Sequence, residues 1–235
     1  MTKNKTNGLL SKSASIKLGV VSLIIGVVVF IVSYISMRQH ILLDDLNQPV
    51  LDWAINHRNQ FFVPIAKFVT NLAGPMSFIL ITTFVVGIWT VRKRETRRPF
   101  LLICSMFIAA TTSTLMKLLV MDTRPEQANM IPSFEVDYSF PSGHTLSTAV
   151  FLLVIGYLIY SRNYSKNDFS YWTIIASAGT IAVAFTRLYL GYHWLTDVVA
   201  SIGLGFIILG SIILVDRLLV PKLKQFKATS LNNVQ

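Results

Sequence analysis

Residues 141–160 read PSGHTLSTAVFLLVIGYLIY, so that a polar block of four residues leads directly into an apolar run. Pro141 suits the first turn of a helix, because its fixed φ is helical and an N–H group there has no intrahelical partner. The run from His144 to Tyr160 is the shortest in the chain that could cross the roughly 30 Å of hydrocarbon in a bilayer. This stretch predicts a membrane-spanning helix whose first turn is polar.

The first turn of that helix would also form an anion site. Backbone N–H groups around Ser142 and His144, together with the Ser142 hydroxyl, could surround phosphate oxygens, and Gly143 would let the backbone approach closely. The same block would equally suit an ordinary capped helix start with a surface histidine. Taken alone, it leaves both interpretations open.

Outside this stretch the chain is rich in apolar residues and poor in charge. Of its 235 residues, 53% are hydrophobic and 14% are charged, which departs from soluble composition. Five further apolar runs are Ser15–Met37, Phe61–Val91, Pro99–Val120, Phe169–Leu190 and Trp194–Val215. We therefore predict an all-α polytopic membrane bundle of about six transmembrane helices, with the second run bent at Pro75. One domain is expected over residues 15–221, between polar tails at 1–14 and 222–235.

The net charge of +10 is distributed unevenly. If the N-terminus lies inside, fifteen of the 21 lysines and arginines fall in inner segments, and eight of the eleven acidic residues fall in outer ones. Such an excess of inner cations is typical of membrane proteins. The pattern predicts two cytoplasmic termini, places residues 141–144 outside, and argues against a nucleic-acid partner. The Lys-rich termini favour a bacterial plasma membrane, and the first run lacks a cleavage site and is expected to remain as an anchor.

Two other charged blocks interrupt the apolar sequence. They are Lys117 with Arg124-Pro125, and Arg187 with His193 and Asp197. Ionisable side chains near hydrocarbon are expensive and indicate function. An arginine can bind phosphate bidentately, a lysine acts as a point charge, and a carboxylate four positions after a histidine on a helix can orient its imidazole. Considered separately, Lys117 could simply snorkel and the His–Asp pair could be structural.

Taken together and in order, the three blocks resemble the signature of the type 2 phosphatidic acid phosphatase family. One departure is Thr186, where many members have Ser before the arginine. The resemblance implies an integral membrane phosphatase that acts on lipid phosphates without a metal or other cofactor.

The resemblance also implies a role for each residue. His193 would be the nucleophile that forms a phosphohistidine, and Asp197 would orient it. His144 would protonate the leaving oxygen and then activate water. The phosphoryl oxygens would be held by Lys117, Arg124, Ser142, Gly143 and Arg187.

The blocks bind only the phosphate, so they leave the lipid open. An outer-face site on a small six-helix protein fits recycling of a polyprenyl carrier, so we expect undecaprenyl diphosphate first and phosphatidylglycerophosphate or phosphatidic acid second. A lipid phosphotransferase would use the same phosphohistidine. A transporter is a further alternative, although transport sites usually lie near the membrane midplane. The sequence makes no prediction of the oligomeric state.

The remaining candidate ligands do not indicate a metal site. A cluster of cations would repel a divalent ion, and the chain has no H-E-x-x-H motif. His40 and His57 are expected to be solvated, and Cys104, the single cysteine, is expected to serve packing.

Two outer segments carry their own predictions. A helical spacing of apolar residues predicts a short interfacial helix, with Leu43, Leu46, Val50 and Trp53 on its apolar face. The longest outer connection, Asp122–Phe140, is either a lid over a lipid or a segment packed on helix ends. Its apolar residues are Met130, Ile131, Phe134, Tyr138 and Phe140.

Overall fold

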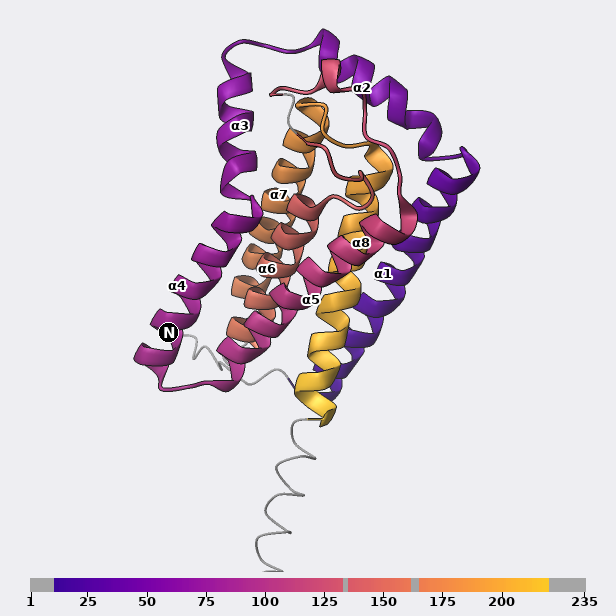
Figure 1. Cartoon of the computed structure of the whole chain (residues 1–235). Helices are drawn as coiled ribbons and strands as arrows, with labels where there is room; N and C mark the ends of the chain where they lie inside the picture. Colours follow the sequence, from indigo (N-terminus) through magenta and orange to yellow (C-terminus); the bar gives the residue numbers. More distant parts are fainter. Residues whose placement is uncertain (1–10, 133–134, 162–164, 220–235) are drawn as a thin grey trace, which may run out of the picture.

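The computed structural model describes residues 11–132, 135–161 and 165–219, and this part of the chain is helical apart from its connections (Figure 1). The helices are α1 (Lys12–Gln39), α2 (Asn47–Asn56), α3 (Phe62–Leu72), α4 (Pro75–Lys93), α5 (Arg97–Val120), α6 (Gly143–Tyr160), α7 (Lys166–Tyr189) and α8 (Leu195–Leu214). Short turns are η1 (Asp44–Leu46), η2 (Gln127–Asn129) and η3 (Val215–Leu219).

The predicted tails lie mostly outside the described residues. Of the segment 1–14, only its last residues are described, and they already belong to α1, which begins at Lys12. The Ser11 hydroxyl caps this helix by accepting a hydrogen bond from the Ala14 N–H at 3.1 Å. The segment 222–235 is wholly outside the described part.

Within the described residues, six helices are long and apolar enough to cross a membrane, namely α1, α4, α5, α6, α7 and α8 extended by η3. This confirms the predicted all-α architecture and the predicted number of spans. The large side chains on the outer faces of α1 and α4, such as Ile24 and Phe84, are exposed, as expected where lipid replaces water.

The second apolar run was predicted wrongly as one helix bent at Pro75. It forms two helices, the short α3 and the membrane-spanning α4, separated at Gly74. Gly74 has an extended backbone at the N-cap of α4, and Pro75 occupies the first helical position. At the first position of a helix an N–H group has no intrahelical acceptor, so a proline there loses no hydrogen bond. Inside a continuous helix it would remove one, and the chain therefore starts a new helix at Pro75.

α1 and α8 lie side by side along their length (Figure 1). Their glycines make this approach possible: a Cβ atom at Gly26 would lie 2.6 Å from the Gly203 carbonyl oxygen, and one at Gly210 would lie 2.6 Å from the Gly19 carbonyl oxygen. In a bilayer, helices associate through such close backbone packing, because hydrocarbon supplies no hydrophobic driving force.

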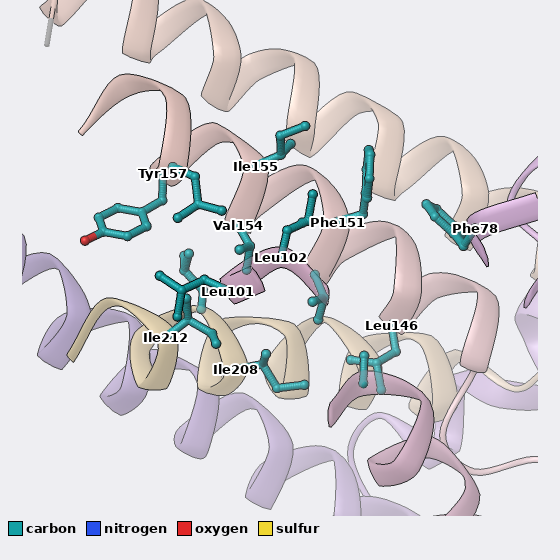
Figure 2. Close-up of a cluster of buried hydrophobic side chains, with 14 of the residues drawn as sticks. Phe78, Leu101, Leu102, Leu146, Phe151, Val154, Ile155, Tyr157, Ile208 and Ile212 are labelled. Carbon is teal, nitrogen blue, oxygen red and sulfur yellow. The ribbon is translucent and has the colours of Figure 1, made fainter. Parts of the chain in front are cut away.

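The main apolar core lies between α6, α8 and α5, with Phe78 of α4 at one end. Figure 2 shows Leu102, Val154 and Ile208 pointing into this cluster from three different helices. α6 and α8 are the most enclosed of the six spans. Their first turns are therefore held on a rigid support.

A buried carboxylate fastens the end of the bundle where α8 finishes. Asp216 of η3 lies 2.7 Å from Arg97 at the start of α5 and accepts a hydrogen bond from the Tyr157 hydroxyl at 2.8 Å. Three elements are thus tied together at this end. The charged blocks lie at the other end.

The short amphipathic helix forms as predicted, as η1 and α2, and part of its apolar stripe faces away from the bundle. Leu46 and Trp53 are exposed, while Asn47, Leu51 and Ala54 are buried. The reason is polar: the Asn47 side chain donates to the Thr196 hydroxyl at 3.2 Å and accepts from the Thr196 N–H at 3.1 Å. This contact turns Asn47 toward the start of α8 and leaves the apolar stripe outside.

Candidate active site

The three charged blocks meet at one end of the bundle, at the top of Figure 1. Lys117 lies near the end of α5, and Arg124 lies in the connection that follows. Ser142, Gly143 and His144 lie at the start of α6. Arg187 lies near the end of α7, and His193 and Asp197 lie at the start of α8. The structure therefore brings together residues that the sequence separates. They lie at helix ends rather than at mid-span, unlike the sites usual in transporters.

A cavity of about 260 Å³ opens between these helix ends. Its lining includes Lys117, Arg124, Gly143, His144 and His193. A larger groove of about 790 Å³ lies at the opposite end, between α4 and α6, and no histidine lines it. The titratable groups that phosphoryl transfer needs are at the smaller cavity.

His193 and Asp197 are at the centre of the site, and both are buried. The Nδ1 atom of His193 lies 3.0 Å from the Oδ2 atom of Asp197. The same carboxylate oxygen accepts from the Trp194 N–H at 2.8 Å and from the Ser139 hydroxyl. With three donors on one oxygen, the carboxylate cannot turn away from the imidazole. Asp197 also lies in the first turn of α8, where the helix dipole favours a negative charge.

Arg124 determines which ring nitrogen of His193 carries the proton. Its Nη1 atom lies 3.2 Å from the Nε2 atom of His193. A guanidinium only donates, so Nε2 accepts with its lone pair and Nδ1 carries the proton that is donated to Asp197. Burial, and then the charges of Arg124 and Arg187, lower the pKa of His193 well below its ordinary value. His193 is therefore a neutral imidazole at neutral pH.

Arg124 is held by backbone carbonyl groups as well as by charge. Its Nη1 atom donates to the Tyr192 carbonyl at 2.6 Å, and its Nε atom donates to the Asp137 carbonyl at 2.8 Å. Pro125, expected to constrain the backbone here, is buried directly after it. The planar guanidinium is thereby fixed in one orientation.

Arg187 is almost fully buried, with 1% of its surface exposed. Its Nη1 atom donates to the Thr70 hydroxyl at 3.0 Å, and its guanidinium lies 4.2 Å from the centre of the Tyr192 ring. Thr70 belongs to α3, the short helix created by the break at Gly74. The unpredicted break thus supplies a partner that positions a predicted cation.

The start of α6 differs from the sequence prediction. Pro141 precedes the helix instead of occupying its first turn, and Ser142 is the N-cap residue. The Ser142 hydroxyl lies 3.1 Å from the Thr145 hydroxyl, and the Ser142 carbonyl accepts from Ser201 of α8 at 2.9 Å. Tying Ser142 to α8 places the first turn of α6 beside the imidazole of His193, and the N–H groups of a first turn have no intrahelical partner.

Gly143 and His144 face the cavity from this first turn. A Cβ atom at Gly143 would lie 3.2 Å from the Ser113 hydroxyl of α5, so a larger residue would crowd the approach to the backbone. The Nε2 atom of His144 is near Gly74, at 3.7 Å from where a Cβ atom on that glycine would lie. His144 therefore lies between the helix break and the cavity.

Two acidic residues that pattern reasoning missed cover the cations. The two carboxylate oxygens of Asp137 lie 2.7 Å from Nζ of Lys117 and 2.6 Å from Nη2 of Arg124. Glu135 lies 2.7 Å from Nη2 of Arg124 with one oxygen and pairs with Arg187 through the other. Their one sequence signal is their place in the Asp122–Phe140 connection, and carboxylates are not expected beside a phosphate site.

Ser139 and Asn47 were also missed. Ser139 bonds Asp197 and lies 3.4 Å from Nδ1 of His193, and Asn47 anchors the start of α8 through Thr196. No local pattern distinguishes either residue from other loop serines and asparagines. Only the fold brings them to the His–Asp pair.

The connection Asp122–Phe140 packs on helix ends at two points, which supports the packing interpretation. Met130 is buried with Tyr189 and Tyr192, and Phe140 is buried with Met37 of α1. Tyr138 is exposed, and Phe134 lies outside the described residues. The approach is close: a Cβ atom at Gly191, which has φ of +78°, would lie 2.2 Å from the Asn129 carbonyl oxygen.

The histidines outside the site are exposed as expected, but they have partners. The Nδ1 atom of His40 lies 2.9 Å from Asp44, four positions away, a spacing that the sequence analysis overlooked. His57 stacks on Trp53 with ring centres 4.9 Å apart. Cys104 is half-buried. Within residues 11–132, 135–161 and 165–219, no three His, Cys, Asp or Glu side chains lie close enough together to form a metal site.

Known proteins share both the sequence pattern and the fold. The sequence is 28% identical to phosphatidylglycerophosphatase B of Bacillus subtilis over 156 residues, which cover 66% of this chain and 75% of that enzyme. It is 26% identical to an undecaprenyl-diphosphatase of Sulfolobus acidocaldarius over 125 residues, covering 52% of this chain and 56% of the relative.

A crystal structure of a transmembrane PAP2 type phosphatidylglycerolphosphate phosphatase from Bacillus subtilis has the same fold. The TM-score is 0.72 at 19% identity, over 80% of this chain and 94% of that one. Residues 98–219, just over half of the chain and including all three charged blocks, match the PAP2 superfamily. The chain therefore belongs to the PAP2 superfamily and is a membrane lipid phosphatase.

Proposed function

We propose that the chain hydrolyses a lipid phosphate through a phosphohistidine at His193, on the outer side of a bacterial plasma membrane. One observation carries the proposal. The Nδ1 atom of His193 is fixed by Asp197, and its Nε2 lone pair faces the cationic side of the site at Arg124. A neutral imidazole held in this tautomer is a nucleophile, and the cation formed on attack is stabilised by the carboxylate.

In the first step Arg124 turns its hydrogen bond from Nε2 of His193 to an oxygen of the bound phosphate, the freed lone pair attacks phosphorus, and the bond between phosphorus and the lipid oxygen breaks. His144, which lines the same cavity, acts as general acid and gives its proton to the departing oxygen. Lys117, Arg124 and Arg187 bind the equatorial oxygens together with the first-turn N–H groups of α6. Positioning and charge stabilisation of this kind provide most of the catalysis in phosphoryl transfer.

In the second step a water molecule attacks the phosphorus of the phosphohistidine. Its proton passes to His144, the phosphorus–nitrogen bond breaks, and the electron pair returns to Nε2 of His193. Inorganic phosphate leaves, and both histidines regain their starting protonation states. A lipid alcohol is the other product from a monoester, and a lipid monophosphate is the other product from a diphosphate.

Two lipids are the leading substrates. Undecaprenyl diphosphate remains first, supported by the outer position that the charge distribution predicts and by the activity in the name of the archaeal relative. Phosphatidylglycerophosphate is the second candidate, because the similarity to phosphatidylglycerophosphatase B covers 75% of that enzyme. A phosphotransferase would pass the phosphate to an acceptor, so the yield of free phosphate separates it from a hydrolase.

The substrate is tested with purified protein and a panel of lipid monophosphates and diphosphates in the presence of a chelator. We expect the release of inorganic phosphate to be unaffected by the chelator. In the proposed mechanism, lysine and arginine side chains provide the positive charge that metal ions provide in a metal-dependent phosphatase. A requirement for added magnesium or zinc would contradict this mechanism.

The nucleophile is tested by replacement and by trapping. His193→Ala should lower turnover by at least about a thousandfold, as removal of a catalytic nucleophile does. Rapid denaturation during turnover should leave phosphohistidine at residue 193 of the wild type. His57→Ala, which changes an exposed histidine, is the control and should retain activity. Substantial turnover by His193→Ala would refute the assignment.

A further inference from the structure

We propose that the carboxylates of Glu135 and Asp137 bind the phosphate-binding cations when no substrate is present. They would thereby restrict the site to terminal phosphate groups with about two negative charges. The inference rests on the proposed function and adds two specificity-determining residues to it. Singly charged phosphodiesters, the headgroup linkage of ordinary anionic phospholipids, would then be excluded.

The contacts of the two acids match those that a phosphate would make. Asp137 bridges Lys117 and Arg124 at 2.7 and 2.6 Å, and Glu135 bridges Arg124 and Arg187, the first of these at 2.7 Å. All four carboxylate oxygens thus contact cations. Charged oxygens at this distance from guanidinium and ammonium groups are what a bound phosphoryl group supplies.

The exposure of the side chains indicates which groups can move. The side chains of Arg124, Arg187 and Lys117 are 5%, 2% and 14% exposed, whereas those of Glu135 and Asp137 are 25% and 56% exposed. The cations also keep partners that do not depend on the acids: the Tyr192 carbonyl for Arg124, Thr70 for Arg187 and the Tyr138 carbonyl for Lys117. An incoming phosphate can therefore displace the carboxylates without dismantling the cation cluster.

The charges then determine which ligand can replace the acids. Two carboxylates balance two of the three cationic charges, so a ligand must bring similar charge to displace both. A phosphomonoester carries about −1.5 to −2 at pH 7, whereas a phosphodiester carries a single charge. Without the acids, three buried cations beside the membrane would attract the anionic headgroups that surround the protein. Glu135 and Asp137 would prevent this occupancy.

The test is the charge-removing double variant Glu135→Gln/Asp137→Asn, which keeps the size of both side chains. The substrate is the lipid monoester that the wild type hydrolyses fastest, and the competitor is phosphatidylglycerol in mixed micelles. We expect phosphatidylglycerol to inhibit the double variant at roughly tenfold lower concentration than the wild type, and KM for the monoester to fall several-fold. Glu126→Gln changes an exposed acid of the same connection and should match the wild type.

Equal inhibition of the wild type and the double variant would overturn the inference while leaving the proposed function intact, because hydrolysis by the wild type is measured in the same assay. If the wild type hydrolyses none of the lipids, the proposed function fails. Binding of inorganic phosphate, measured by thermal shift, then tests the acids alone. Tighter phosphate binding by the double variant supports the inference that the two carboxylates compete with phosphate for the cations. Equal or weaker binding refutes that inference.

If the double variant does not yield folded protein, Glu135→Gln and Asp137→Asn are measured separately. Each leaves one carboxylate on the cluster, so each should show a smaller gain in phosphatidylglycerol inhibition and in phosphate binding. Single variants indistinguishable from Glu126→Gln would also overturn the inference.

Discussion

At the scale of the residue, one buried carboxylate oxygen of the site is shared by three donors. The Oδ2 atom of Asp197 accepts hydrogen bonds from Nδ1 of His193, from the Trp194 N–H and from the Ser139 hydroxyl. In the proposed mechanism, this oxygen both orients the imidazole and balances the charge that develops on attack. Replacing the carboxylate by an amide separates the two effects.

Asp197→Asn should lower kcat by about 10² to 10⁴-fold with little change in KM, because an amide can contact the ring but cannot stabilise its positive charge. Steady-state kinetics with the best lipid substrate provides the measurement. Asp216→Asn is the matched control, since Asp216 is also buried but lies at the far end of the bundle. An Asp197→Asn rate within about threefold of the wild type would reduce Asp197 to a structural residue.

The lowered pKa of His193 also predicts a pH dependence of stability. Burial, and then the charges of Arg124 and Arg187, keep this imidazole neutral in the folded protein, whereas in the unfolded chain it protonates near its ordinary pKa of about 6.5. The unfolded state therefore binds more protons below that pH. The contribution of His193 to the free energy of unfolding should be fully present above about pH 6.5 and should be lost progressively as the pH drops toward the lowered pKa.

Denaturation in detergent at pH 7.5 and pH 5.5 checks this against His193→Asn, in which the titrating group is absent. The wild type should lose more stability on acidification than the variant does, because the other three histidines are present in both proteins. An identical pH dependence in the two proteins would show that His193 titrates normally.

At the scale of the element, the spans were predictable and their ends were not. Long apolar runs specify α1, α5 and α8 because each must satisfy its own backbone in hydrocarbon. Helix ends depend on caps and neighbours: α4 starts at the Gly74-Pro75 break, and α6 starts after Pro141 instead of at it. The pairing of α1 with α8 depends on glycines of both helices, and only their contacts in space distinguish them from the other glycines of the chain.

Gly26→Ala should destabilise the protein, because the new Cβ atom would lie 2.6 Å from the Gly203 carbonyl and 2.7 Å from the Ile207 nitrogen. Both neighbours are backbone atoms, so relief requires the helices to separate, and overpacking of this kind costs about 1–3 kcal/mol. Thermal denaturation in detergent measures the effect.

Gly87→Ala on α4 is the control, since within the described residues no atom other than its chain neighbours and the nearby backbone of its own helix lies within 4 Å of the position of its Cβ. This change should be neutral or stabilising by up to about 1 kcal/mol, the helix-propensity difference between the two residues. If Gly26→Ala were as stable as Gly87→Ala, the α1–α8 contact would be looser than described.

At the scale of the whole molecule, the first residues of α1 and the last of α8 lie at one end, and the active-site connections lie at the other (Figure 1). An even number of spans places both termini on the same side of the membrane. The charge distribution then predicts the sides of the membrane: Arg94, in the connection between α4 and α5, and Arg97, at the start of α5, should be cytoplasmic, and the site should face outward.

Single reporter cysteines in a Cys104→Ser background test this orientation. Ala128→Cys, at an exposed residue of η2, should react with an impermeant thiol reagent on intact cells, and Thr96→Cys, at an exposed residue before α5, should react only after the membrane is opened. The reverse pattern would invert the protein, place His193 on the cytoplasmic side and exclude a role in recycling lipid carriers at the outer face.

By itself, the sequence determined the six spans and the three charged blocks that converge on one site. Both are one-dimensional properties: a bilayer requires a minimum length of apolar helix, and a charge beside hydrocarbon needs a partner or a function. Lys117, Arg124, His144, Arg187 and the His193–Asp197 pair could therefore be named without a structure.

Only the tertiary structure decided what surrounds these residues. Ser139 on Asp197, Thr70 on Arg187, and the two acids on the cations come from segments far away along the chain. Contacts of this kind depend on how helix ends and connections meet in space, and no local periodicity encodes that. The burial of Asn47 has the same cause, because its hydrogen-bonded partner Thr196 lies at the start of α8, far away along the chain.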